Sequence, residues 1–226
     1  MDYPSALVMV VTLDIEPAWE AEFDRWHVEE HVPLLLSLPG FVAAERWRAL
    51  RGQPEYMAWY QLDSLDAYEK SAGGALTLRP EHAAVVNTEW AARVREHRKV
   101  EVAFYQQLTA PDGFAYGPAW DGGKTKSAAN ITFRTSIPPE HESEFNRWYL
   151  EEHFPNLTSV PGVLMGRRFK AIEGEPQYMA RYDYVDATVP DSEVWLAAAE
   201  TPWTHAIRKK HVDRRLVLYE RIGGQS

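Results

Sequence analysis

A twelve-residue segment that occurs twice constrains this chain more than any other feature. Residues 22–33 read EFDRWHVEEHVP and residues 144–155 read EFNRWYLEEHFP, a spacing of 122 residues. The same spacing carries Pro39-Gly40 onto Pro161-Gly162 without a gap, and about half of positions 15–60 are identical to their counterparts. Self-similarity at a fixed spacing indicates a duplicated structural unit, here of about a hundred residues, which is an ordinary size for a small domain.

The composition restricts the partners that such a chain can bind. The 226 residues carry a formal net charge of −9 and contain no cysteine. Nucleic acid and anionic membrane surfaces are held by clustered Lys and Arg, so neither is expected as a partner. The N-terminal residues lack the basic and apolar regions of a signal peptide, and no run approaches the roughly 20 apolar residues of a membrane span. We expect a cytoplasmic protein.

Hydrophobic periodicity predicts one order of elements in the first copy. Apolar runs at 6–15, 41–50, 55–62 and 100–108 predict strands. A helix is predicted from residue 17 onward, and it should kink or end near Pro33. Residues 64–98 are expected to be mostly helical. The order β-α-β-β-α-β is typical of a ferredoxin-like unit with an antiparallel sheet and both helices on one face.

The second copy repeats this order after a segment rich in Gly, Pro and Asp. The expected boundaries are residues 1–108 for repeat 1, 109–127 for a linker whose aromatic residues lie against a surface, and 128–226 for repeat 2. In repeat 2, strands are expected at 128–137, 163–172, 177–185 and 215–222, with a helix at about 191–209. Tyr105 matches Tyr219 at a spacing of 114, so repeat 2 has lost eight residues in its second helical region.

The repeated motif resembles that of a known family. Phe23, Trp26, His31 and Pro33, followed by Pro39-Gly40, match the pattern of the EthD-type branch of the dimeric α+β barrel superfamily, and the echo is Phe145/Trp148/His153/Pro155/Pro161/Gly162. The resemblance implies an α+β fold in which the two ferredoxin-like repeats form an intramolecular, pseudo-twofold barrel, with a pocket between helices and sheet. Similar proteins include cyclases, dehydratases, isomerases, cofactor-free monooxygenases and haem proteins, so the fold does not select the reaction.

Four ionisable residues are the candidate catalytic groups. His31 and His153 titrate near neutral pH when unperturbed, and the resemblance places the EthD histidine at this position. Glu30 and Glu152 fall on the expected buried stripe of the helix, where desolvation would raise a carboxyl pKa. The alternative is structural: each histidine ties the helix end to the next loop, and each glutamate pairs with an arginine of the neighbouring strand, Arg46 or Arg168 in the respective copy.

Aromatic residues near this motif are candidate substrate-binding groups. Strand alternation places tyrosines on one face in each copy, and tryptophans sit beside the histidines, although all of them also suit a core. The candidate binding residues are Trp26, His27, Arg46, Tyr56, Tyr60, Trp148, Tyr149, Arg168, Tyr178 and Tyr182.

A metal or cofactor is not expected. The residues HVEEH at 27–31 spell the H-x-x-E-H pattern of some zinc peptidases, but Tyr149 replaces His27 in repeat 2, so the histidine pair is not repeated. Gly-rich phosphate loops and serine-hydrolase elbows are absent from the sequence. A haem protein with His31 or His153 as axial ligand is the alternative that an absorption spectrum would distinguish.

The favoured function is cofactor-independent acid/base chemistry on a small aromatic or polyketide-like molecule, as in a dehydratase, isomerase or cyclase. A ligand-binding or structural barrel without turnover, and a haem-binding or cofactor-free monooxygenase barrel, are the alternatives, and further homo-oligomerisation is compatible with all three. Because His27 and the longer second helical region are confined to repeat 1, we expect the larger polar cavity there, with His31 and Glu30 directed into it.

Overall fold

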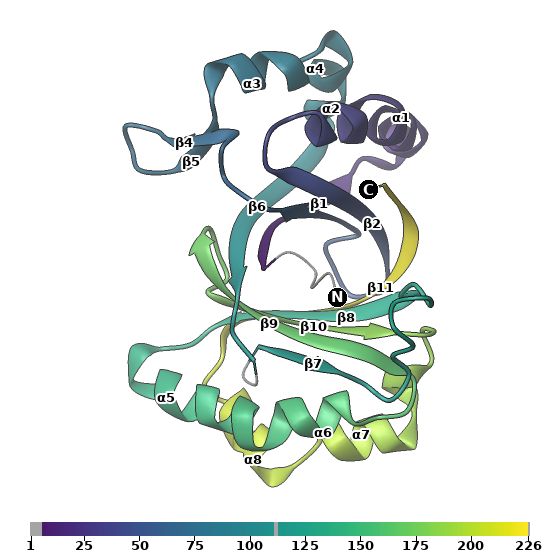
Figure 1. The fold of residues 1–226 in the computed structure, drawn as a ribbon, viewed down its shortest axis with the longest axis vertical. Coiled ribbons are helices and arrows are strands. Elements are labelled where there is room, and N and C mark those ends of the chain that lie inside the picture. The colour runs from purple at the N-terminus through teal and green to yellow at the C-terminus, as the bar shows by residue number, and fades with distance from the viewer. Residues whose placement is uncertain (1–5, 111–112, 226) are drawn as a thin grey trace. The chain divides into compact units, whose positions relative to one another are not determined.

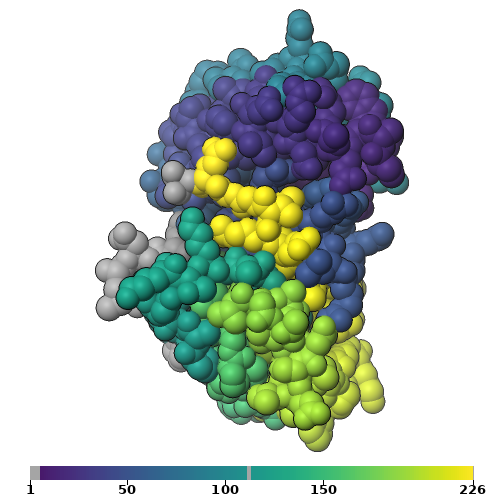
Figure 2. Space-filling model, turned by 90° about the vertical axis from the view of Figure 1, so that its right-hand side faces the viewer, coloured from purple at the N-terminus to yellow at the C-terminus, as the bar shows by residue number. Residues whose placement is uncertain are grey.

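The structure is a computed structural model that describes residues 6–110 and 113–225 (Figure 1). The chain divides into two compact units. The first contains Met1–Trp47, Pro54–Phe104 and Ile222–Ser226, and the second contains Arg48–Gln53 and Tyr105–Arg221. Residues 222–225, at the yellow end of the colour scale in Figure 2, belong to the first unit. No helix in the described ranges is long and apolar enough to cross a membrane.

The first unit has a four-stranded sheet in the order β2-β3-β1-β6, with its helices on one face (Figure 1). Its elements are β1 (Leu7–Ile15), the 3-10 turn η1 (Pro17–Trp19), α1 (Glu20–Trp26), the π-helical turn η2 (His27–His31), α2 (Val32–Leu36), β2 (Phe41–Arg51), β3 (Tyr56–Leu62), β4 (Tyr68–Lys70), β5 (Leu76–Leu78), α3 (Pro80–Val86), α4 (Glu89–Arg95) and β6 (Arg98–Gln107). Gly40 closes the turn into β2 with φ 87°, a value that favours glycine.

The second unit repeats this arrangement in the order β9-β10-β8-β11. Its elements are β7 (Phe114–Tyr116), β8 (Ala129–Ser136), α5 (Pro139–Trp148), the π-helical turn η3 (Tyr149–His153), α6 (Phe154–Thr158), β9 (Val163–Glu173), β10 (Tyr178–Tyr184), the 3-10 turn η4 (Val189–Asp191), α7 (Glu193–Ala199), α8 (Pro202–Arg208) and β11 (Val212–Gln225). Register is repeated as well, since Leu13 pairs with Tyr56 and the equivalent Thr135 pairs with Tyr178.

The strand pairings confirm the predicted fold class. The described strands other than β4 and β5 share one sheet, in the order β10-β8-β11-β2-β3-β1-β6-β9-β7, and β10 also pairs with β9. This ring of eight strands is a closed α+β barrel. A ring leaves none of its members with an unpaired edge.

Both repeats contain a π-helical turn immediately before a proline. The N–H of Val32 bonds to the carbonyl of His27, five residues back, and Phe154 bonds to Tyr149 in the same way. The next residue, Pro33 or Pro155, has no N–H to donate. The π-helical turn accommodates the hydrogen bond that proline cannot make, so the helix continues to Leu36 in repeat 1 and to Thr158 in repeat 2. Of the two predicted outcomes near Pro33, a kink or an end of the helix, the structure excludes the end.

Two predictions of local structure were wrong. Residues 64–79 are not helical, because they form a loop that contains the β4–β5 hairpin. The helix expected at about 191–209 is two helices, since Thr201 caps the second of them and Pro202 occupies its first turn. Within the expected linker, β7 pairs with β9, which agrees with the prediction that this segment lies against a surface; residues 111 and 112 are outside the described part.

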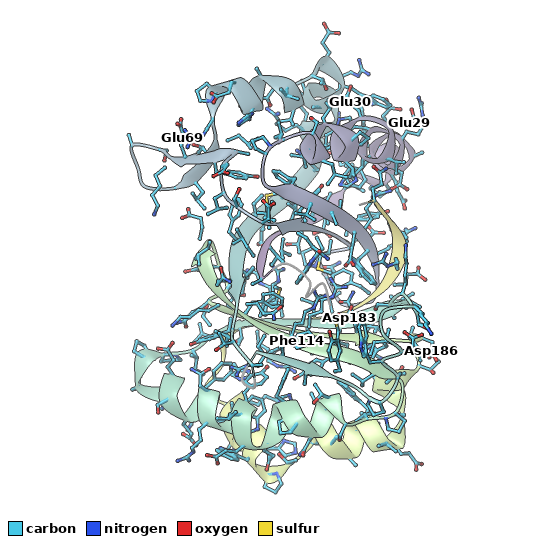
Figure 3. The ribbon with its side chains drawn as sticks, in the orientation of Figure 1. Glu29, Glu30, Glu69, Phe114, Asp183 and Asp186 are labelled. Atoms are coloured by element: carbon cyan, nitrogen blue, oxygen red, sulfur yellow. The ribbon has the colours of Figure 1, made fainter. Side chains whose placement is uncertain are left out.

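Alternation along β10 separates an apolar face from a charged one. Tyr178, Tyr182 and Tyr184 belong to the cluster packed against the helices. On the other face Asp183 is buried and binds two buried arginines, Arg167 at 3.0 Å and Arg181 at 2.6 Å (Figure 3). Burial raises the pKa of Asp183, but the two guanidinium groups lower it more, and the net pKa lies below the ordinary value.

Candidate functional site

A cavity of about 390 Å³ lies inside the second unit, between its helices and its sheet. Pockets of this size bind small organic molecules. Three groups of side chains line it: aromatic and aliphatic residues, two histidines, and charged residues at its edge. The lining residues are Arg51, Ile131, Phe133, Trp148, Tyr149, His153, Leu157, Tyr182, Pro190, Asp191, Trp195, Leu196, Ala199, Glu200, Thr204, Arg208, His211, Arg214 and Leu216.

The π-helical turn places the repeated motif on the cavity wall. The ring of His153 stacks on Trp148 with centroids 4.1 Å apart, and Tyr149 meets the same imidazole edge-on at 5.3 Å. Thr204 on α8 lies 3.5 Å from Nδ1 of His153. Arg168 stacks over Tyr149 at 3.8 Å and binds Asn146 at 2.9 Å. Aromatic packing therefore fixes the orientation of the groups that face the cavity.

Both cavity histidines are neutral at pH 7. Burial, reinforced by Arg208 and Arg168, lowers the pKa of His153 from 6.5 to about 3. Burial, reinforced by Arg214 and Arg208, lowers the pKa of His211 to about 4. Burial also raises the pKa of Tyr149 to about 12, so the phenol keeps its proton. At pH 7 these three side chains can form hydrogen bonds without carrying a charge.

Three polar side chains on this cavity have no hydrogen-bond partner among the described residues. They are Trp148 through Nε1, Tyr182 through its hydroxyl, and His211 through both ring nitrogens. All three line the cavity. A buried polar group without a partner costs about 1–3 kcal/mol, which makes these three residues candidates for hydrogen bonds to a ligand.

The repeat 1 equivalents of Trp148 and Tyr182 are bonded within the protein, whereas Arg98, which aligns with His211 at a spacing of 113, also has an Nε without a partner among the described residues. Trp26 Nε1 donates to Glu30 at 3.1 Å, and the hydroxyl of Tyr60 lies 3.2 Å from Nε2 of His27, whose Nδ1 has no partner among the described residues. His31 stacks on Trp26 at 4.3 Å, as His153 does on Trp148. Both copies keep the stacked histidine and tryptophan rings. The Trp26–Glu30 and Tyr60–His27 hydrogen bonds of repeat 1 have no counterpart among the described residues of repeat 2.

Two cavities of repeat 1 are lined by residues other than the predicted catalytic pair. One of about 10 Å³ is lined by residues such as Phe23, Arg46 and Tyr56, and another of about 330 Å³ is a surface pocket at residues 14–16 and 96–99. His31 and Glu30 line neither. The larger polar cavity predicted for repeat 1 is not among these two, and the extra segment packs into the core: Ala67 and Tyr68 are buried there, and Leu65, Leu76 and Leu78 pack against them.

The two glutamates have the same structural partner in each repeat. Thr88 caps α4 and donates to Glu30 at 2.5 Å, and Thr201 caps α8 and donates to Glu152 at 2.5 Å. Glu30 lies in the helical layer (Figure 3), and Glu152 is not part of the cavity wall. Each carboxylate therefore fixes a helix start.

The expected pairing of these glutamates with strand arginines was also wrong. Arg46 binds Asp24 at 2.5 Å, and Arg168 binds Asn146, so each arginine is held by the helix turn before the glutamate. Tyr56 and Tyr178 likewise bond to carboxylates, Glu20 at 2.6 Å and Glu142 at 2.5 Å. Of the predicted residues, the structure brings Trp148, Tyr149, His153 and Tyr182 together on one cavity.

Sequence reasoning missed Arg208 on α8, Arg214 on β11 and His211 in the turn between these elements. A signal was present, because TEWAARVR at 88–95 aligns with TPWTHAIR at 201–208 at a spacing of 113. At Tyr105 and Tyr219 the spacing is 114, so repeat 2 contains one more residue between α8 and Tyr219 than repeat 1 does in the equivalent segment. A β-bulge between Val212 and Arg215 contains this extra residue. At spacing 113, His211 aligns with Arg98, so identity between the copies could not reveal it.

Metal ligands are not clustered in the described part of the chain, where no group of three or more His, Cys, Asp or Glu side chains is placed to hold an ion. No family model matches the sequence, and no curated protein matches it.

Solved structures do resemble the fold. An anthrone oxidase-like protein superposes with a TM-score of 0.60 at 12% identity, over 98% of this chain and 94% of that one. A mutant chlorite dismutase from Candidatus Nitrospira defluvii gives 0.58 at 9% identity, over 96% and 93%. A protein from Lactobacillus acidophilus NCFM, named provisionally as a monooxygenase, gives 0.52 at 12% identity, over 97% and 95%. These similarities place the chain in the dimeric α+β barrel fold, without selecting the EthD-type branch.

Proposed function

We propose that the cavity of repeat 2 binds a small planar aromatic molecule with oxygen substituents and that the chain oxidises it with molecular oxygen, as a cofactor-free monooxygenase. The observation that carries the proposal is the set of unpaired polar groups on an aromatic cavity wall, Trp148 Nε1, Tyr182 and His211. Their counterparts in repeat 1, Trp26 and Tyr60, are bonded internally. Repeat 2 is therefore the copy that is prepared for a ligand.

The unpaired groups define which ligand atoms they would accept. The indole N–H of Trp148 only donates, the hydroxyl of Tyr182 donates or accepts, and neutral His211 donates through one nitrogen and accepts through the other. A carbonyl oxygen of the ligand would accept from both Trp148 and Tyr182, and an acidic C–H or O–H group would face His211. Trp148, Tyr149 and Trp195 would pack against its rings.

An anthrone-type substrate fits this inventory and needs no external reductant. Loss of a proton from the CH₂ group next to the aromatic rings gives a delocalised carbanion whose charge rests partly on the carbonyl oxygen. The carbanion adds molecular oxygen, and the resulting hydroperoxide loses water. The sum is R₂CH₂ + O₂ → R₂C=O + H₂O, in which one oxygen atom enters the product and the other becomes water.

The protein's contribution would be electrostatic and steric. Tyr182 and Trp148 would donate hydrogen bonds to the oxygen on which the charge develops. Neutral His211 would accept the proton; its pKa of about 4 makes it a weak base in the empty cavity, and the substrate anion beside it would raise that value. His153, stacked on Trp148, would keep the indole in position.

Two other interpretations are less well supported. The lyase or isomerase function favoured from the sequence needs a carboxyl acid, and Glu30 and Glu152 are instead bonded to helix caps. An axial haem histidine usually donates its second nitrogen to a carboxylate or carbonyl. The neighbour of His153 Nδ1 is the hydroxyl of Thr204 at 3.5 Å, so these residues do not provide that support for haem. The EthD-type assignment rests on the repeated motif alone, and further oligomerisation stays a prediction.

The test is oxygen consumption and anthraquinone formation with anthrone, corrected for the reaction without protein. We expect turnover in the wild type and a loss of about 10²-fold in kcat/KM for Tyr182→Phe, which removes one hydroxyl from the cavity. Tyr60→Phe is the matched control in repeat 1, and we expect it to retain kcat/KM. No turnover above background, or equal losses in the two variants, would count against the proposal.

A further inference from the structure

The charges around the repeat 2 cavity do not cancel. Three arginines and two carboxylates line it, and both histidines are neutral. Two of the arginines are paired: Arg208 binds Glu200 through both terminal nitrogens at 3.0 and 2.7 Å, and Arg51 binds Asp191 at 3.0 Å. One positive charge is left over in a cavity with aromatic walls.

The remaining charge belongs to Arg214. Its guanidinium lies 5.6 Å from the ring centre of Phe133 and has no carboxylate within ion-pair distance among the described residues. The adjacent carboxylate, Asp213, is bound by Arg215 at 2.8 Å, and Glu200 is already held by Arg208. Glu200 still attracts Arg214 at longer range, but the hydrogen bonds of both acids go to other arginines.

The backbone supports a special position for this residue. A β-bulge falls between Val212 and Arg215, and Asp213 within it has φ 51°, in the left-handed region. Bulges re-aim side chains and are frequent beside binding sites. The spacing between the two copies is 113 residues at α8 and 114 at Tyr219 on β11, and the bulge contains this one additional residue. The residue is absent from the sequence of repeat 1, so repeat 1 has no counterpart of the bulge.

We infer that the cavity selects aromatic ligands that carry a carboxylate, held by Arg214 at the cavity edge while the rings lie against the aromatic wall. The inference rests on the proposed function and adds an ionised group to the substrate class. Arg–carboxylate hydrogen bonds are stronger than neutral ones, and Arg214, which is exposed to solvent, is one of the residues that line the cavity. The remaining lining carboxylates do not oppose it, since each is already paired with an arginine.

The inference is tested with two probes of nearly equal shape, anthracene-2-carboxylate and anthracene-2-carboxamide, titrated against tryptophan fluorescence at pH 7. We expect the carboxylate to bind the wild type about tenfold more tightly than the amide, which is what one charge-assisted hydrogen bond contributes. Arg214→Gln should abolish the preference, and Arg214→Lys should restore part of it. Lys209→Gln, which removes an exposed charge outside the cavity wall, is the matched control and should retain the preference.

The outcomes separate this inference from the proposed function. Equal affinities for the two probes in the wild type, or an unchanged preference in Arg214→Gln, would overturn the carboxylate site and leave an aromatic pocket in place. Binding of neither probe would overturn both. Thermal unfolding of each variant distinguishes a lost contact from a lost fold, and Arg214→Lys provides a second readout if Arg214→Gln unfolds.

Discussion

Removing one tyrosine hydroxyl should have opposite consequences in the two repeats. In repeat 1 the hydroxyl of Tyr60 is bonded to buried His27 at 3.2 Å. Tyr60→Phe keeps the ring and leaves Nε2 of His27 without its partner. The hydroxyl of the equivalent Tyr182 has no partner among the described residues. Tyr182→Phe therefore removes a hydroxyl that is buried without a hydrogen bond to offset the loss of its contact with water.

The magnitudes follow from the cost of an unsatisfied buried group. Tyr60→Phe should lower the free energy of unfolding by about 1–3 kcal/mol. For a protein of this size each kcal/mol corresponds to about 2–4 °C in Tm. Tyr182→Phe removes an unsatisfied group and should raise the free energy of unfolding by up to about 1–3 kcal/mol.

Equilibrium urea unfolding, followed by tryptophan fluorescence and far-UV circular dichroism, measures both changes. A double-mutant cycle of Tyr60→Phe with His27→Ala isolates the coupling between the two side chains. If Tyr182→Phe destabilises the protein as much as Tyr60→Phe does, the contrast between a satisfied and an unsatisfied repeat is refuted. The argument for placing the site in repeat 2 would then fail with it.

Three further predictions concern buried polar groups. Asp183→Asn removes a buried carboxylate that two buried arginines share and should cost about 3–5 kcal/mol in urea unfolding. Thr88→Val and Thr201→Val each remove a helix cap and the partner of a glutamate; each should cost about 1–2 kcal/mol, and a loss confined to one repeat would contradict the shared role. The pKa values of His31 and His153 are lowered to about 3 in the folded state, so the unfolded chain binds more protons than the folded chain below pH 6.5. For each of these histidines, the free energy of unfolding should therefore be constant above pH 6.5 and fall by at most about 1.4 kcal/mol per pH unit below it. His153→Gln should make this fall less steep in urea unfolding between about pH 7 and 4.

The duplication, the order of the four barrel strands within each repeat, and the fold class follow from the amino-acid sequence alone. These follow from local patterns: alternation along β3 and β10, helical spacing before Pro33 and Pro155, and a Pro-Gly turn at the same place in both copies. Such patterns set which face of each element is buried. The α+β fold follows from that without knowledge of individual contacts.

The location of the site was decided by tertiary structure. Identity between the copies drew attention to residues that both repeats share, such as Glu30 and Glu152, and these carry shared structural bonds. A binding site depends on which polar groups are left unpaired, and Tyr182 and His211 acquire that property only through what lies beside them. The extra segment of repeat 1 is long enough to enlarge a cavity or to fill one, and its side chains fill the core. Hydrogen-bond pairing and cavity volume are sums over contacts between distant parts of the chain, so they cannot be read from periodicity within one element.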